Sequence, residues 1–259
     1  MYETLEYTVE NHIATVKLNR PKKLNAMNPA MVREIHTVAD AVRADPNVHV
    51  LMFHGEGRTF SAGADIAELV RMGTPPQFLR FIEDIQSAFN AVDDLGVPTI
   101  AAMNGLAYGG GCELAISCDF RIMAEDATIG VPEIKIGALP GAGGTARLSK
   151  MLPPAIAKQM IYFGDPLDSA TALRLGLVNV VVPADRVLET ARDWARRLAA
   201  LPPLGIKSGK ALVHAGINAD LKTAMEAAQQ AMAFLYGTED RREGMAAFLE
   251  KRAAKFVGK

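Results

Sequence analysis

The stretch YGGGCELAIS, residues Tyr108–Ser117, places three consecutive glycines and then a carboxylate at the head of a segment as apolar as a core helix. Glycines remove every side chain from a short loop, so another group can approach the backbone closely. Glu113 follows directly before Leu114, where little solvent is expected. The stretch therefore predicts a helix that starts at a bare backbone loop and can receive a small group there.

A second glycine loop has the same context. TFSAGADI, residues Thr59–Ile66, also follows a strand-like run and leads into a helix-like one. The N–H groups at a helix start have no partners inside the helix. Two such loops that converge would aim two donors at one carbonyl oxygen, and loss of one such donor costs about 3 kcal/mol of barrier. For either loop alone, an ordinary tight turn is the simpler interpretation.

Working outward, residues 1–200 alternate short β-like runs with helical patterns, which predicts an α/β fold. One helix is expected to begin at Asn28-Pro29, a cap followed by a proline in the first turn, and to end before Asp45-Pro46. Strands are expected over 13–19, 49–55, 97–105 and 119–125.

The pattern changes after Pro202-Pro203, where no strand signal remains and Ala-, Glu-, Lys- and Met-rich segments continue to residue 259. These segments predict a helical appendage. Its apolar faces suit either another subunit or the chain's own core, and the pattern favours neither.

Composition narrows the function classes. Apolar residues make up 49% of the 259 and charged residues 22%, as in ordinary soluble globular proteins. The 28 basic and 29 acidic residues leave a net charge of -1, which predicts no binding to nucleic acid or to an acidic membrane surface. The stretch MYETLEYTVE carries acids where a signal peptide needs a basic flank, so no signal peptide is expected. Pro98 and several glycines interrupt the longest uncharged run, so no membrane span is expected either.

Metal and disulfide chemistry are not expected either. Cys112 and Cys118 are spaced as C-x5-C, which matches neither a zinc pair nor a disulfide framework, and this favours a reducing, cytoplasmic location or an organelle matrix. The five histidines lack the spacing of a metal-binding helix.

Two glutamates lie in apolar surroundings. Glu113 falls in the first turn of a predicted helix, and Glu133 stands between Val131-Pro132 and Ile134. Burial raises the pKa of an acid toward values that are useful for proton transfer, so both are candidate acid–base residues. The helix dipole alone would also explain Glu113, and alternation that turns Glu133 to solvent would explain the second glutamate.

Two other motifs resemble known functional fingerprints but do not meet the requirements of those fingerprints. GAGGTA, Gly141–Ala146, matches a dinucleotide fingerprint, but it lies in the middle of the chain behind Leu139-Pro140 rather than after a first strand. Ser61 resembles a nucleophile elbow, yet Thr59 stands where that motif requires glycine, so Ser61 is expected to be structural.

Taken together, these stretches resemble the enoyl-CoA hydratase/isomerase (crotonase) family. The resemblance covers nearly the whole chain and implies a spiral of repeated ββα units, followed by a helical region that builds trimers, often paired into hexamers. Residues 1–200 would then form the spiral core with the site, and residues 201–259 the trimerisation region. The motifs that carry it are NRPKKLNAM (19–27), TFSAGADI (59–66), the run NGLAYGGGCELAIS to GAGGTARL (104–148) and TEDRREGMAAFLEKR (238–252).

The resemblance also implies roles for individual residues. In the family, acyl thioesters of coenzyme A bind with the carbonyl oxygen held by two backbone N–H groups, which by motif fall on Ala64 and Gly110. Glu113 would be the base that orients and deprotonates water for the β-carbon, and Glu133 would deliver a proton to the α-carbon. Coenzyme A is part of the substrate, so no separate cofactor is implied. Further implied substrate contacts, the last two from this chain or a neighbouring subunit, are Lys22, Leu24, Ala26, Ala62, Asp65, Ile66, Gly141, Phe248 and Lys251.

The activity implied by the resemblance is addition of water to 2-enoyl-CoA thioesters, in fatty-acid or related acyl-CoA degradation. A double-bond isomerase of the same family would need only Glu133, so the presence of Glu113 favours hydration. An RNA-binding relative without turnover is a third alternative, but no run of Lys and Arg exceeds two residues. Ala146 departs from the Gln that close hydratase relatives usually carry there.

Overall fold

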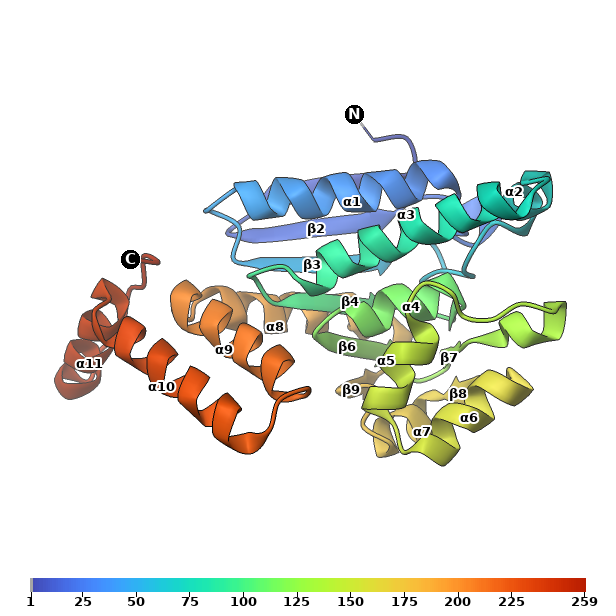
Figure 1. The fold of residues 1–259 in the computed structure, drawn as a ribbon. Coiled ribbons are helices and arrows are strands. Elements are labelled where there is room, and N and C mark those ends of the chain that lie inside the picture. The colour runs from blue at the N-terminus through green and yellow to red at the C-terminus, as the bar shows by residue number, and fades with distance from the viewer. Residues whose placement is uncertain (1) are drawn as a thin grey trace.

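The computed structural model describes residues 2–259, which form two sheets surrounded by helices (Figure 1). The larger sheet has the order β1-β2-β3-β4-β6-β9, with β1 and β2 antiparallel and the remaining pairs parallel. The smaller sheet has the order β5-β7-β8. The strands of the larger sheet are β1 (Leu5–Glu10), β2 (Ile13–Leu18), β3 (Val50–Gly55), β4 (Thr99–Met103), β6 (Phe120–Ala124) and β9 (Val180–Val182). Those of the smaller sheet are β5 (Ala107–Tyr108), β7 (Thr128–Gly130) and β8 (Leu167–Asp168).

The chain repeats one unit as it crosses the two sheets. Strand β4 of the larger sheet is followed by β5 of the smaller sheet and then by helix α4 (Gly110–Ser117); β6 is followed by β7 and the 3-10 helix η2 (Pro132–Ile136). After β3, Ser61 forms an isolated parallel bridge with Ala107 before helices α2 (Ile66–Arg71) and α3 (Pro75–Asp93). Each turn therefore has two strand-like segments and a helix, and the repetition brings the glycine loops of successive turns together.

The longer elements agree with the sequence prediction. The α/β class is confirmed, and the four predicted strands correspond to β2, β3, β4 and β6. Helix α1 (Pro29–Ala44) begins where the Asn28 side chain accepts a hydrogen bond from the Met31 amide, and it ends at Asp45. Its apolar spacing buries one face, as the period of 3.6 residues predicts.

Five strands were not predicted, for two physical reasons. Strand β1 lies at the edge of its sheet, and four of its six residues are exposed, so its sequence LEYTVE carries little apolar signal. Strands β5, β7, β8 and β9 have only two or three residues each, which is too short for a period of two to be recognised.

The core lies between the larger sheet and the helices that pack on it. Strands β3 and β4 are almost entirely buried, as expected for parallel strands covered on both faces. Helices α1 and α3 pack on each other, and α8 (Val187–Ala199) packs on β3, β4 and β6. Helices α5 (Gly144–Met151), α6 (Pro154–Phe163) and α7 (Ser169–Arg174) cover the smaller sheet's side of the molecule (Figure 1).

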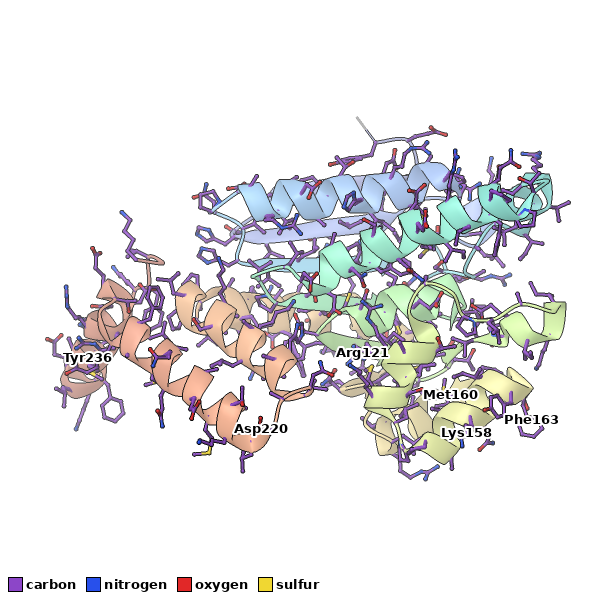
Figure 2. The ribbon with its side chains drawn as sticks, in the orientation of Figure 1. Arg121, Lys158, Met160, Phe163, Asp220 and Tyr236 are labelled. Carbon is purple, nitrogen blue, oxygen red and sulfur yellow. The ribbon has the colours of Figure 1, made fainter. Side chains whose placement is uncertain are left out.

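Three helices extend away from this core on the left of Figure 1: α9 (Pro203–Gly216), α10 (Leu221–Tyr236) and α11 (Glu239–Glu250). The boundary expected at residue 200 falls between α8 and α9. No residue of α9 or α10 is buried, and Tyr236, labelled at the outer end of α10 in Figure 2, is 62% exposed. Across residues 2–259, no helix is long and apolar enough to cross a membrane.

Candidate active site

Helix α4 places Glu113 one turn inside the core. Gly109 caps the helix with φ +51, a conformation that favours glycine, and Glu113 is only 3% exposed. Oε1 of Glu113 accepts hydrogen bonds from the backbone N–H groups of Ala142 and Gly144, at 2.7 and 2.8 Å. The loop before α5 therefore fixes one oxygen of this carboxyl group, which leaves the other oxygen for a further partner.

A buried arginine anchors the opposite end of α4. Arg121, labelled in Figure 2 near the centre of the molecule, is 6% exposed. Its guanidinium donates to the carbonyl oxygens of Ala115 at 3.2 Å and Cys118 at 2.5 Å, at the end of α4, and to that of Leu177 at 2.6 Å. These bonds satisfy carbonyls that a helix end leaves unpaired, and the cation complements the negative end of the helix dipole.

The pKa of Glu113 is raised from 4.5 to about 7, chiefly because burial disfavours the charged form. The hydrogen bonds from Gly144 and Ala142 lower this pKa, the charge of Glu133 raises it, and that of Arg147 lowers it. A carboxyl group with a pKa near neutrality can both accept and return a proton under ordinary conditions.

The side chain of Glu133, on η2, lies over the glycine loop from which α4 begins. Its Oε1 would lie 2.9 Å from a Cβ atom on Gly109, so its carboxyl group is directly above the glycine loop. Its Oε2 is buried and has no hydrogen-bond partner among the described residues. Desolvation raises the pKa of Glu133 as well. A buried carboxyl oxygen without a partner is costly, and such an oxygen is well placed to bind a reacting group or a water molecule.

The two glycine loops meet, as the family resemblance implies. Gly63 has φ +92, and a Cβ there would lie 2.7 Å from the Tyr108 carbonyl oxygen and 3.2 Å from the Gly110 nitrogen. A Cβ on Gly110 would lie 3.7 Å from the Ala64 nitrogen. Only glycine allows the two loops to approach this closely.

The amides of Ala64 and Gly110 are left as free donors. On either side of Ala64, Met27 donates to the Gly63 carbonyl at 2.7 Å and Asp65 donates to the Met27 carbonyl at 2.9 Å. Within residues 2–259, neither the Ala64 nor the Gly110 N–H donates a hydrogen bond. Two adjacent unpaired donors beside two carboxyl groups are the components of an oxyanion-binding acid–base site.

Most of the expected substrate-binding residues lie beside these donors. The segments 20–27 and 62–66 run together, because Ala62 donates to the Leu24 carbonyl at 2.9 Å and Ala64 forms a parallel bridge with Met27. Asp65 caps α2 and pairs with Arg20 at 3.0 Å. Its carboxylate is therefore engaged inside the chain, as are its N–H, which donates to Met27, and its carbonyl, which accepts from Glu68 and Leu69. The expected residues gathered here are Lys22, Leu24, Ala26, Ala62, Asp65 and Ile66.

Phe248 and Lys251 are not part of this assembly in one chain. Helix α11 lies at the left of Figure 1, whereas α2 lies at the right. Phe248 is 82% exposed, and Lys251 caps the end of α11 with φ 55. Any contact of these two residues with a ligand at the site would have to come from a neighbouring subunit.

Sequence reasoning missed the two amides that hold Glu113. Ala142 and Gly144 belong to GAGGTA, which fails as a dinucleotide fingerprint and forms part of one of the family-like motifs, but neither interpretation assigned a role to these two amides. The useful signal was a glycine turn that opens a helix and so offers free N–H groups. Gly141 lies in the same loop, where its carbonyl accepts from Gln86 at 2.6 Å. Ala146, on α5, is exposed.

Ser61 proves structural, as predicted. It is fully buried, donates from Oγ to the Asn25 carbonyl at 2.8 Å and accepts from the Gly63 N–H at 3.2 Å. Among the residues described, 2–259, no group of three or more His, Cys, Asp or Glu side chains is placed to hold a metal ion.

Comparison with known proteins identifies the family. The family model described as enoyl-CoA hydratase/isomerase matches residues 8–259. The chain belongs to the enoyl-CoA hydratase/isomerase family. It is 39% identical over 259 residues, 100% of this chain and 99% of the relative, to a protein named crotonyl-CoA hydratase from Syntrophomonas wolfei. It is 38% identical to the short-chain-enoyl-CoA hydratase of Clostridium acetobutylicum, over 94% of this chain and 93% of that protein.

Solved structures agree with this assignment. The crystal structure of enoyl-CoA hydratase from Bacillus anthracis superimposes with a TM-score of 0.96 at 34% identity, and the match covers 99% of this chain and 100% of that one. The fold of this enoyl-CoA hydratase/isomerase family member is therefore the crotonase spiral that its motifs resemble.

Proposed function

We propose that this chain is a hydro-lyase that adds water across the double bond of 2-enoyl-CoA thioesters and yields 3-hydroxyacyl-CoA. One observation carries the proposal: two carboxyl groups with raised pKa values, Glu113 and Glu133, face a glycine loop whose amide is free to donate. The names of the similar proteins, crotonyl-CoA hydratase and short-chain-enoyl-CoA hydratase, support the same reaction.

The free amides polarise the substrate. The thioester carbonyl oxygen accepts hydrogen bonds from the Ala64 and Gly110 N–H groups, and the positive end of the α4 dipole lies behind the second donor. Addition to the β-carbon moves electron density from the double bond onto this oxygen. The donors stabilise the resulting enolate more than the neutral thioester, so they lower the barrier.

The carboxyl groups handle one water molecule. Ionised Glu113 accepts a proton from water as the water oxygen bonds to the β-carbon, and protonated Glu133 gives its proton to the α-carbon as the enolate collapses. The product gains one O–H group and one C–H bond, and the pair of acids ends with one proton, as it began. Because Glu133 raises the pKa of Glu113, the two groups titrate as a coupled pair.

The rival activity is double-bond isomerisation, which moves a proton between the α- and γ-carbons and needs one acid–base group. The hydrogen bonds from Ala142 and Gly144 to Glu113 favour hydration, because they orient a second carboxyl group that an isomerase does not require. The test is to mix the protein with a short 2-enoyl-CoA and follow loss of the conjugated thioester absorbance. No loss at any chain length, with turnover of a 3-enoyl-CoA, would assign the isomerase instead.

We propose further that the chain forms a homotrimer or a pair of trimers. The support is the number of large apolar side chains on α9 to α11 that one chain leaves exposed: Val213, Leu221, Met225, Met232, Phe234, Met245, Phe248 and Leu249. In such an assembly, Phe248 and Lys251 of one subunit would bind the nucleotide end of coenzyme A on another. The absence of a separate cofactor, a cytoplasmic location and a place in fatty-acid degradation stay predictions.

A further inference from the structure

We infer that Arg147, held in place by Asp93, is a positioning residue that fixes the loop 141–144 and, through it, the carboxyl group of Glu113. The inference concerns the site to which hydration is assigned above and rests on that proposed function. The guanidinium of Arg147, on α5, joins the loop directly before that helix to α3, which lies more than fifty positions earlier in the chain.

The loop needs such support because part of it borders a wide groove. A groove of about 1120 Å³ is lined by residues of α9 and α5, and Ala142, Gly143 and Arg147 form part of its wall. On its other side, the same loop donates two amides to Glu113. Gly143 has φ +109 and no side chain that could pack, and at its backbone the carbonyl accepts a hydrogen bond from the Arg147 N–H at 2.8 Å.

Arg147 lies directly over this glycine. Its Nη1 would be 2.1 Å from a Cβ on Gly143, and the same nitrogen donates to the Ala142 carbonyl at 3.4 Å. Ala142 thus donates its N–H to Glu113 and accepts at its carbonyl from Arg147. The peptide groups on either side of Ala142 are therefore both hydrogen-bonded, which restricts their rotation.

Helix α3 supplies the fixed point. Nη2 of Arg147 donates to Asn90 Oδ1 at 2.7 Å and to Asp93 Oδ2 at 3.0 Å, both on the last turn of α3. The side chains of Arg147 and Asp93 are 17% and 33% exposed, so solvent screens this pair only in part. Gln86, two turns earlier on α3, donates to the Gly141 carbonyl at 2.6 Å. The loop is therefore attached to one helix at two points.

Several other charged groups lie near Arg147 and its contacts with Ala142, Asn90 and Asp93, which we call the clamp. Glu133 from η2 and Arg147 from α5 act on the carboxyl group of Glu113. Asp93 faces Arg147 and also His214 on α9, whose Nε2 is 3.8 Å from Asp93 Oδ1; beyond it lie Asp119 and Lys210, which form an ion pair at 2.8 Å. Because the cation of Arg147 lowers the pKa of Glu113, its removal should raise that pKa further.

The test compares Arg147→Met, which removes the charge and the donors, with Arg147→Lys, which keeps only the charge. In the full chain, Arg147→Met should lower kcat for a short 2-enoyl-CoA by about tenfold to a hundredfold, the cost of a misplaced reacting group, with little change in KM. The acid limb of its kcat/KM profile should move to higher pH, and hydrogen exchange at amides 142 and 144 should accelerate. Arg147→Lys should restore the acid limb but not the slow exchange.

Two further variants keep the test decisive. Asp93→Asn removes the charged partner of Arg147 on α3 and keeps its hydrogen bond to Asn90, so it should shift exchange and kcat in the same direction by a smaller factor. Arg186→Met removes an exposed ion pair with Glu189 at 2.7 Å and should change neither. If Arg147→Met does not fold, the kcat and loop exchange of Asp93→Asn and Arg147→Lys test the inference in its place.

The inference is overturned if Arg147→Met and Asp93→Asn leave kcat, the acid limb and exchange of the loop at wild-type values, or if only KM changes. A wild-type chain that hydrates no enoyl-CoA refutes the proposed function alone. The clamp is then judged by loop exchange and by the pKa of Glu113, read from carboxyl carbon NMR and assigned with Glu113→Gln. If Arg147→Met changes neither the hydrogen exchange of the loop nor the pKa of Glu113, the positioning role of Arg147 is rejected in that case as well.

Discussion

The nitrogen of Ala64 lies 3.7 Å from the point that a Cβ on Gly110 would occupy, although the two residues belong to different turns of the spiral. Bridges between Met27 and Ala64 and between Ser61 and Ala107 hold the two loops at this distance. The adjacent backbone groups are bound, and these two amides are left to donate. A pair of preorganised donors needs no rearrangement when charge develops on an oxygen, which is why such pairs stabilise transition states well.

A methyl group at Gly63 should separate the two donors. In Gly63→Ala, the new Cβ would stand 2.7 Å from the Tyr108 carbonyl at a residue with φ +92, so the backbone next to Ala64 must shift. We expect kcat to fall by about a hundredfold, the value of one such donor. Steady-state kinetics check this, with Gly176→Ala as the matched control, since Gly176 has φ +74 and open space around it. Equal losses of kcat in both variants would show that backbone strain at a positive φ, and not the separation of the two donors, causes the loss.

Replacement of Glu113 should remove the base and keep the loop. In Glu113→Gln, the amide oxygen can still accept from Ala142 and Gly144, so the fold should persist. Hydration should fall by roughly two to four orders of magnitude, the scale of general acid–base catalysis. The measurement is the rate of loss of enoyl-thioester absorbance, with circular dichroism as the check of folding. A near-native rate would show that Glu113 is not the base.

Glu133→Gln should have a loss of the same order, about two to four decades, because the enolate would lack its proton donor. The loss should be as large in isomerisation of a 3-enoyl-CoA, if any is detected, whereas Glu113→Gln should affect isomerisation less. The ratio of the two activities in each variant is the readout. If Glu133→Gln retains hydration but loses isomerisation, its assigned role is wrong.

The raised pKa of Glu113 should make the folded protein less stable as the pH rises. The folded pKa is about 7, above the usual 4.5, so the native state holds this proton between those values while the unfolded state has released it. The free energy of unfolding should therefore fall from pH 4.5 to 7, by about 3 kcal/mol in all from this group. Urea unfolding of wild type and Glu113→Gln across this range measures the difference. A gap between them that does not widen with pH contradicts the assignment.

Ser61→Ala should lower stability and preserve chemistry. The hydroxyl group bonds the Asn25 carbonyl and the Gly63 amide in a fully buried position, so its loss should cost roughly 1–3 kcal/mol of unfolding free energy. Urea midpoints and kcat at a temperature well below unfolding separate the two effects. A drop of several orders of magnitude in kcat with unchanged stability would mark Ser61 as a nucleophile after all.

The sequence was most informative where a long period or a glycine cluster left a clear signal. The pattern predicted α1 because its cap, its apolar spacing and the Asp45-Pro46 end all agree. The glycine clusters marked the loops at Gly63 and Gly110 as candidates to converge, and the family resemblance implied that they do. The edge strand β1 and the short strands of the smaller sheet had no such signal.

Other features depend on tertiary contacts between distant segments. The amides of Ala142 and Gly144 reach Glu113 across about thirty positions of sequence, and Arg147 reaches Asp93 across more than fifty. No local pattern encodes either distance. The place of Phe248 could not be read from one chain at all, because its exposed side chain belongs to a surface that a single copy leaves open.

The most direct measurement of the central claim is isotope incorporation during turnover of a short 2-enoyl-CoA. In H₂¹⁸O, the account predicts a 3-hydroxyacyl-CoA with ¹⁸O on the β-carbon; in D₂O, it predicts one deuterium on the α-carbon. Both labels should disappear together in Glu113→Gln. A wild-type product that carries no ¹⁸O, or deuterium at the γ-carbon with a shifted double bond, would contradict the claim that the two amides and two carboxyl groups add water.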